Sequence, residues 1–258
     1  KIKPSIADIA YVLFLVRPLI VIIISIIFIR KEDKSLSFIP FKPSKKIFYE
    51  TLNFLKGISI ITLIAQAYNR GPKFILGIIT NPGIVASWAL AERLREPFLQ
   101  IQNSILRPLL PIGSRLNIND KQNKEIIFKV SKYMTMIIGG LSILALIFIE
   151  DFVQLWVGKD FENTIFIIRI LFIIFLLPNT GAMLMLYYSK GKTKANVKFT
   201  FLNSIISLGL GTLLAIPYNG IGFSIGIVIS YIIILIIKFN FFCREFAINF
   251  LTFIKKAY

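Results

Sequence analysis

Residues 199–237 read FTFLNSIISLGLGTLLAIPYNGIGFSIGIVISYIIILII, a stretch that contains no charged side chain. A helix needs about 20 mostly apolar residues to cross a bilayer core about 30 Å thick, because each residue adds about 1.5 Å. The stretch is long enough for two crossings, and Pro217-Tyr218-Asn219-Gly220 near its middle favours a tight turn by its residue types. The sequence therefore predicts two membrane-spanning helices, about Val197–Ile216 and Ile221–Ile237.

Five further apolar stretches are long enough to cross a membrane. They cover about Ile9–Ile29, Phe48–Ile79, Gly83–Leu110, Val130–Ile149 and Thr164–Tyr188. We expect a break in the second at Gly71-Pro72, where proline lacks an N–H, and another in the fifth at Pro178-Asn179-Thr180-Gly181. The predicted fold class is an all-α polytopic membrane protein with about seven transmembrane helices.

The composition of the 258 residues supports this class and narrows the chemistry. Hydrophobic residues make up 56% and charged residues only 17%, whereas soluble domains carry about a quarter charged residues. The net charge of +17 agrees with lysines and arginines in cytoplasmic loops, so no nucleic-acid partner is expected. The chain has 0 histidines and one cysteine, Cys243, which argues against histidine triads, zinc sites and intrachain disulfides. We expect no catalytic residue, no metal and no cofactor.

The connections between the spans differ in charge. Lysines and arginines are concentrated in residues 30–46, 115–129 and 190–198 and in the tail from Lys238. The connection Glu150–Asn163, in contrast, has Lys159 as its single cation. The positive-inside rule places the cation-rich set and the carboxyl terminus in the cytoplasm, and the amino terminus outside. No signal-peptide pattern follows Lys1, so we expect a portion of a longer protein.

The long polar connection after the first span marks a predicted domain boundary. Residues 1–29 would be the last transmembrane helix of an upstream, amino-terminal lobe, and 30–47 a cytoplasmic linker kept extended by Pro40 and Pro43. Residues 48–240 would form a carboxy-terminal lobe of six helices, and 241–258 a basic cytoplasmic tail.

The third predicted span carries most of the intramembrane charge. At about 100° per residue, one face within about 80° collects five polar side chains, and we call this face the polar stripe: Glu92, Glu96, Gln100, Asn103 and Arg107. Arg93 and Arg95 flank it. One interpretation is a structural ladder that pairs Glu92 with Arg95 and Glu96 with Arg93; the other is a water-filled translocation path.

An excess of cations favours the translocation path. Arg107 has no carboxylate one turn away in its helix, and Arg17 and Arg169 stand alone in apolar spans. An ionisable side chain inside a membrane is costly, so each one suggests a functional role. The planar guanidinium group of arginine can bind phosphate oxygens with two parallel hydrogen bonds. The candidate substrate-binding residues are Arg17, Arg93, Arg95, Arg107, Arg169, Glu92, Glu96 and Asn103. Separately, Gly222 and Gly226 form a GxxxG pattern that predicts helix packing within the chain.

The order of these features resembles a known family. Residues 84–91, IVASWALA, lead into the charged helix, which ends in LRPLLPIGSRL at 106–116, and FVQLWVGKDF follows at 152–161. This order is similar to that of the polysaccharide flippases, the O-antigen and related lipid-linked oligosaccharide translocases of the multidrug/oligosaccharidyl-lipid/polysaccharide (MOP) exporter superfamily. The resemblance implies two six-helix lobes around a cavity in the bacterial inner membrane. This chain would correspond to the last helix of the first lobe and the whole MATE-like second lobe.

The resemblance also implies a function. The expected protein is no enzyme but a transporter that flips an undecaprenyl-diphosphate-linked oligosaccharide by alternating access during lipopolysaccharide and other surface polysaccharide assembly. Its expected partners are that substrate, membrane lipids and a polysaccharide polymerase or other assembly proteins. A MATE-like multidrug or metabolite antiporter is the main alternative, and a membrane polysaccharide polymerase is a weaker one.

Overall fold

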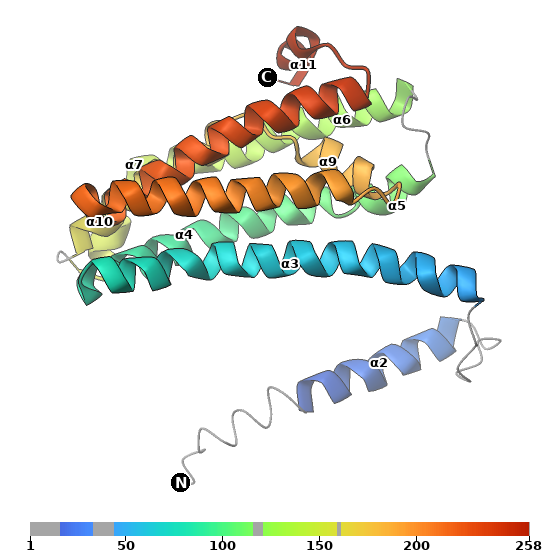
Figure 1. Cartoon of the computed structure of the whole chain (residues 1–258), viewed down its shortest axis with the longest axis horizontal. Helices are drawn as coiled ribbons and strands as arrows, with labels where there is room; N and C mark the ends of the chain where they lie inside the picture. Colours follow the sequence, from blue (N-terminus) through green and yellow to red (C-terminus); the bar gives the residue numbers. More distant parts are fainter. Residues whose placement is uncertain (1–15, 33–43, 116–120, 159–160, 258) are drawn as a thin grey trace. The chain divides into compact units, whose positions relative to one another are not determined.

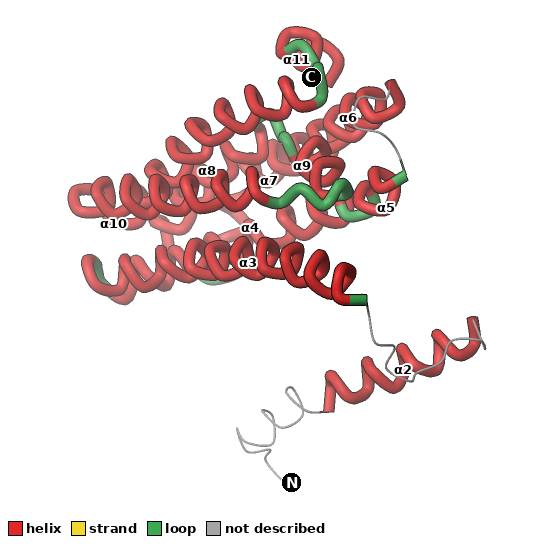
Figure 2. The backbone as a smooth tube through the Cα atoms, turned by 45° about the vertical axis from the view of Figure 1, so that its right-hand side comes forward, coloured by secondary structure: helices red, strands yellow, loops and turns green. Residues whose placement is uncertain are grey.

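The computed structural model describes residues 16–32, 44–115, 121–158 and 161–257. Every regular element in these ranges is a helix, as Figures 1 and 2 show. The helices are α2 (Arg17–Glu32), α3 (Lys45–Ile79), α4 (Pro82–Leu106), α5 (Leu109–Ser114), α6 (Lys121–Met134), the π-helical turn η2 (Thr135–Gly139), α7 (Gly140–Trp156), α8 (Glu162–Leu176), α9 (Gly181–Tyr188), α10 (Lys194–Glu245) and α11 (Phe250–Ala257).

The chain divides into two compact units, Lys1–Phe48 and Tyr49–Tyr258. The first contains α2, whose side chains from Pro18 to Ile27 are all exposed and, except for Ser25, apolar. The start of the predicted first span, residues 9–15, lies outside the described residues, and so does most of the predicted linker with Pro40 and Pro43. The assignment of these segments to two lobes stays a prediction.

Two helical segments in the described residues are long and apolar enough to cross a membrane. They are Lys121–Trp156, which joins α6, η2 and α7, and Lys194–Glu245, which is α10. The pair α8 and α9, bent by 63°, forms a third candidate if it acts as one span. The structure therefore supports a helical protein with membrane-crossing segments, while the count of about seven stays a prediction.

Helix α10 is a hairpin of two arms. Asn219 has φ 51° and ψ −136°, a left-handed backbone that interrupts the helix, as the residue types of 217–220 predict. Beyond this turn Ser230 Oγ donates a hydrogen bond to Asn203 Oδ1 at 3.0 Å, although the two residues are 27 positions apart. The two arms lie side by side and run in opposite directions (Figure 1). Each arm has about 25 residues and spans about 37 Å, enough to cross a bilayer.

The GxxxG pattern lies where the two arms meet. A Cβ on Gly222 would stand 1.9 Å from the Leu214 carbonyl oxygen, and one on Gly226 would stand 2.5 Å from the Gly211 amide nitrogen. Only glycine permits backbones to approach so closely. The predicted packing role within this chain is confirmed.

The two predicted helix breaks have different outcomes. The break at Pro178 is confirmed: α8 ends at Leu176, and Leu177 is extended with ψ 154° because the residue before a proline is disfavoured in the helical region. The break at Gly71-Pro72 is wrong, since α3 remains helical from Lys45 to Ile79. A proline removes one backbone hydrogen bond, and a long helix can tolerate this loss where packing holds the segment; Pro72 is buried. Gly71 lies directly against Leu208 of α10.

Several helices extend further than hydropathy suggests. Glu150 and Asp151 were expected in a loop but belong to α7, which continues to Trp156 and is followed by Gly158 with φ 103°. Lys121 and Lys129, expected in a connection, belong to α6. Hydropathy marks where a helix becomes polar, and lysine and glutamate are good helix formers, so a helix continues past that point.

Helix α8 lies at the centre of the second unit and packs against α4, α7 and α10. Trp88 of α4 is fully buried, and its ring meets Phe223 of α10 edge to face with centroids 5.3 Å apart. Phe98 of α4 meets Phe172 of α8 in the same way at 4.7 Å. These aromatic contacts fix which face of α4 points into the core.

Candidate functional site

Helix α4 positions most of the candidate residues, and its start is defined locally. The Asn81 side chain accepts a hydrogen bond from the Ile84 amide at 3.0 Å, and Pro82 occupies the first turn, where its missing N–H costs nothing. Ile84, Trp88 and Ala91 are then buried against the rest of the unit. The rotation of α4 about its axis follows from this buried face.

The polar stripe of α4 faces away from that core. Glu96, Gln100, Asn103 and Arg107 are all exposed, and the Glu92 side chain is 17% exposed. From Glu92 to Arg107 the stripe extends about 22 Å along the helix. If α4 crosses the membrane as the sequence predicts, its polar face needs a polar counterpart or water on that side, so this exposed face is the candidate site.

The carboxylates of the stripe have partners other than those predicted. Glu92 Oε2 lies 2.6 Å from Lys73 Nζ of α3, and Glu96 Oε1 accepts a 3.4 Å hydrogen bond from Gln100. Neither the Glu92–Arg95 nor the Glu96–Arg93 ion pair forms among the described residues, so the ladder that was one of the two interpretations is not found there. Lys73 was missed because its partner lies on another helix; its signal was a lysine inside a predicted span, directly after Pro72.

The arginines on and beside the stripe form no ion pair with a carboxylate in the part of the chain that the structure describes. Arg93 and Arg107 are exposed. Arg95 is partly buried, and its Nε is buried without a hydrogen-bond partner among those residues. A buried donor without a partner is rare in folded proteins and calls for an explanation. Because Lys73 neutralises Glu92 and Arg107 offsets Glu96, the flanking Arg93 and Arg95 give this region of α4 a net positive charge.

The other two predicted arginines lie elsewhere. Arg169 of α8 is not isolated as expected: its Nη2 donates to Glu150 Oε2 of α7 at 3.0 Å, with both side chains about half exposed. Arg17 is the first residue of α2, in the first unit, and its side chain is outside the described set. The structure therefore places Glu92, Arg93, Arg95, Glu96, Asn103 and Arg107 along α4 and at its carboxyl end, whereas Arg169 lies on α8 and Arg17 on α2 of the first unit.

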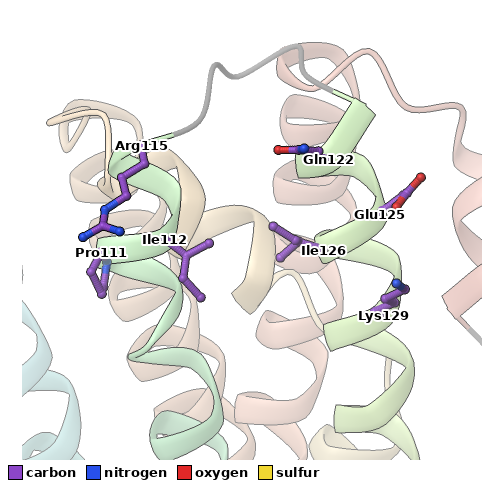
Figure 3. Close-up of a pocket in the computed structure, with 7 residues that line it drawn as sticks. All are labelled: Pro111, Ile112, Arg115, Gln122, Glu125, Ile126 and Lys129. Atoms are coloured by element: carbon purple, nitrogen blue, oxygen red, sulfur yellow. The ribbon is translucent and has the colours of Figure 1, made fainter.

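A separate pocket of about 540 Å³ lies between α5 and α6. Figure 3 shows Ile112 and Ile126 pointing into the gap between these helices. Arg115, Glu125 and Lys129 also line the pocket, and the Arg115 and Glu125 side chains point away from each other (Figure 3). Because its charges are of both signs and do not converge, this pocket offers less to an anion than the α4 stripe.

The Lys73–Glu92 pair yields a prediction about stability. Lys73→Ala should lower the melting temperature of the purified protein, because it leaves the carboxylate of Glu92 partly buried without its cation. Since Lys73 is 45% exposed, solvent screening limits the loss to about 1 kcal/mol, which corresponds to about 2–4 °C. Thermal unfolding of the single variants and of the double variant K73E/E92K measures this.

The charge swap should recover most of the loss, since it restores opposite charges at the same two positions. Lys56→Ala, at an exposed position of the same helix, is the matched control and should melt like the wild type. Single variants as stable as this control would show that the pair contributes nothing.

The comparison with known proteins adds the family. Residues 10–166, more than half of the chain, match the sequence model of a family described as polysaccharide biosynthesis protein. No curated protein and no solved structure matches the chain. The matched range includes the whole of α4 with its polar stripe and the flanking arginines. The chain belongs to the polysaccharide biosynthesis protein family.

Proposed function

We propose that this protein is a flippase of the MOP exporter superfamily, which moves an undecaprenyl-diphosphate-linked oligosaccharide across the bacterial inner membrane for surface polysaccharide assembly, with lipopolysaccharide O-antigen as one such product. The observation that carries the proposal is the exposed polar stripe of α4, bordered by arginines without carboxylate partners among the described residues. Membership in a polysaccharide biosynthesis family supports the sugar part of the cargo.

The chemistry of the stripe suits such a lipid. A guanidinium group offers a planar fork of donors that matches phosphate oxygens and never loses its charge, so Arg93, Arg95 and Arg107 would bind the diphosphate. Asn103 and Glu96 are exposed on the same face and would bind sugar hydroxyls. The length of the stripe leaves room for a diphosphate and several sugars along one helix.

The charge balance favours an anionic cargo over a cationic drug. A cation binds best to carboxylates that lack another partner, but Glu92 is already neutralised by Lys73 at 2.6 Å. Glu96 is then the only acid of the stripe without an ion-pair partner in the described residues, against three arginines on the same helix. This argues against the multidrug antiporter.

The transport cycle needs a second wall opposite α4. An amino-terminal lobe, of which this chain would hold only the last helix, would supply it, and rocking of the two lobes would expose the stripe to each side in turn. With the cation-rich connections inside, the carboxyl terminus would be cytoplasmic. No bond is made or broken in this cycle, and a polysaccharide polymerase would consume the flipped product.

The cargo class can be tested in proteoliposomes that contain the full-length protein. A fluorescent prenyl-diphosphate oligosaccharide should cross the bilayer faster than in protein-free vesicles, and its mass should be unchanged afterwards, while the cationic dye ethidium should not be moved. Movement of ethidium alone would indicate an antiporter, and a lengthened saccharide would indicate a polymerase; either result contradicts the proposal.

A further inference from the structure

An apolar groove of about 390 Å³ lies beside the polar stripe, between α4 and α7. It exists because both helices pack on α8. Phe172 of α8 lines it together with Leu94 and Phe98 of α4 and Phe148 of α7, and Arg93 is the one charged residue among those that line it. Its volume falls in the range of about 300–1,000 Å³ that is typical of ligand sites.

The groove begins where the polar stripe ends. The stripe covers an arc of about 80° around α4, counted from Glu92. At about 100° per residue, Arg93 lies at about 100°, next to the edge of this arc, and Pro97 follows at about 140°. On the other side, Leu144 and Phe148 of α7 line the groove and are 54% and 59% exposed. The polar stripe, the Arg93 guanidinium and the exposed apolar side chains of the groove therefore follow one another around α4.

We propose that this groove binds the first isoprene units of a prenyl-diphosphate lipid, with the Arg93 guanidinium at the phosphate nearest the chain. The proposal rests on the proposed function and names a subsite for the lipid part of its cargo. An amphiphile with an anionic head and an apolar tail matches the order of stripe, arginine and groove. The flat, methyl-branched prenyl chain also suits walls formed by aromatic rings.

Arg93 is available for this role. Of the two nearest acids on its helix, Glu92 is bound to Lys73 and Glu96 accepts from Gln100. The structure records no ion pair for Arg93 within the described residues, and its side chain is exposed at the groove. A phosphate at this position would give the guanidinium its partner and would leave the rest of the prenyl chain in the bilayer.

The test measures binding of geranylgeranyl diphosphate to the full-length protein in phosphatidylcholine nanodiscs. Ala145→Phe, which fills the groove from α7, should weaken binding of this probe at least tenfold and leave binding of inorganic pyrophosphate unchanged. Arg93→Ala should weaken both ligands. Ile147→Phe, at an exposed position of α7 that does not line the groove, is the matched control and should bind like the wild type.

Unchanged binding of the probe to Ala145→Phe would overturn the proposal, as would equal competition by phosphatidylglycerol, which would indicate a groove for membrane lipid in general. If Ala145→Phe melts below its control, a photoreactive residue at Phe148 provides the second test, and failure to crosslink the probe there also overturns the proposal. Failure of the wild type to flip the oligosaccharide, with these binding differences intact, would overturn only the proposed function.

Discussion

Replacing Arg107 with alanine in the full-length protein should strongly reduce surface polysaccharide while the protein remains in the membrane at its normal level. The side chain is exposed at the carboxyl end of the polar stripe and makes no ion pair with described residues, so the fold loses little. A hydrogen bond to a charged group is worth about 1.5–3 kcal/mol, so its loss should slow flipping about 10- to 150-fold. Polysaccharide on the cells and a blot of the membrane fraction provide the two measurements.

Arg95→Ala extends this test to the partly buried arginine. Because the Nε of Arg95 has no hydrogen-bond partner in the described residues, its removal breaks no bond that stabilises the fold. Polysaccharide should be lost without a drop in melting temperature. Arg244→Ala, an exposed arginine in the last turn of α10, is the matched control and should leave polysaccharide unchanged.

Normal polysaccharide in both the Arg107→Ala and the Arg95→Ala variant would contradict the assignment of these arginines to the substrate. Loss of polysaccharide in the Arg244 control as well would indicate a general effect of removing surface charge. The conservative change Arg107→Lys should restore only part of the activity, because an ammonium group keeps the charge but lacks the bidentate fork.

Features that depend on local residue types could be predicted from the sequence. The turn at 217–220 and the break at Pro178 follow from proline, asparagine and glycine, whose backbone preferences act within a few residues. Pro72 shows the limit of this argument: the same residue type lies buried inside an uninterrupted helix, beside the contact of Gly71 with Leu208, and neither its burial nor that contact can be foreseen from the local sequence.

For the candidate site, too, the features that depend on one helix could be predicted, and those that depend on a neighbouring helix could not. The period of an α-helix was enough to place Glu96, Asn103 and Arg107 on one face, and the structure finds that face exposed. Which charges pair was not predictable, because pairing depends on the neighbouring helix and its rotation. Lys73 reaches Glu92 from α3, and Glu150 reaches Arg169 from α7, so neither contact has a signature in the sequence of α4 or α8.

Replacing Gly226 with alanine should destabilise the α10 hairpin strongly. The new Cβ would stand 2.5 Å from the amide nitrogen and 2.6 Å from the Cα of Gly211, and backbone atoms can yield only if the two arms separate. The hydrogen bond between Ser230 and Asn203, one turn further along, would be strained at the same time. Overpacking of this kind costs about 1–3 kcal/mol, so the melting temperature should fall by about 2–12 °C.

Gly209→Ala is the matched control, because it makes the same substitution in the first arm of the same hairpin. No atom lies within 4 Å of the Cβ it would add, and Gly209 is exposed. Alanine favours a helix over glycine by about 1 kcal/mol, so this variant should melt about 2–4 °C higher than the wild type. The two substitutions should therefore change the melting temperature in opposite directions. A Gly226→Ala protein as stable as Gly209→Ala would mean that the arms do not pack through their glycines, and the hairpin would then need another source of stability.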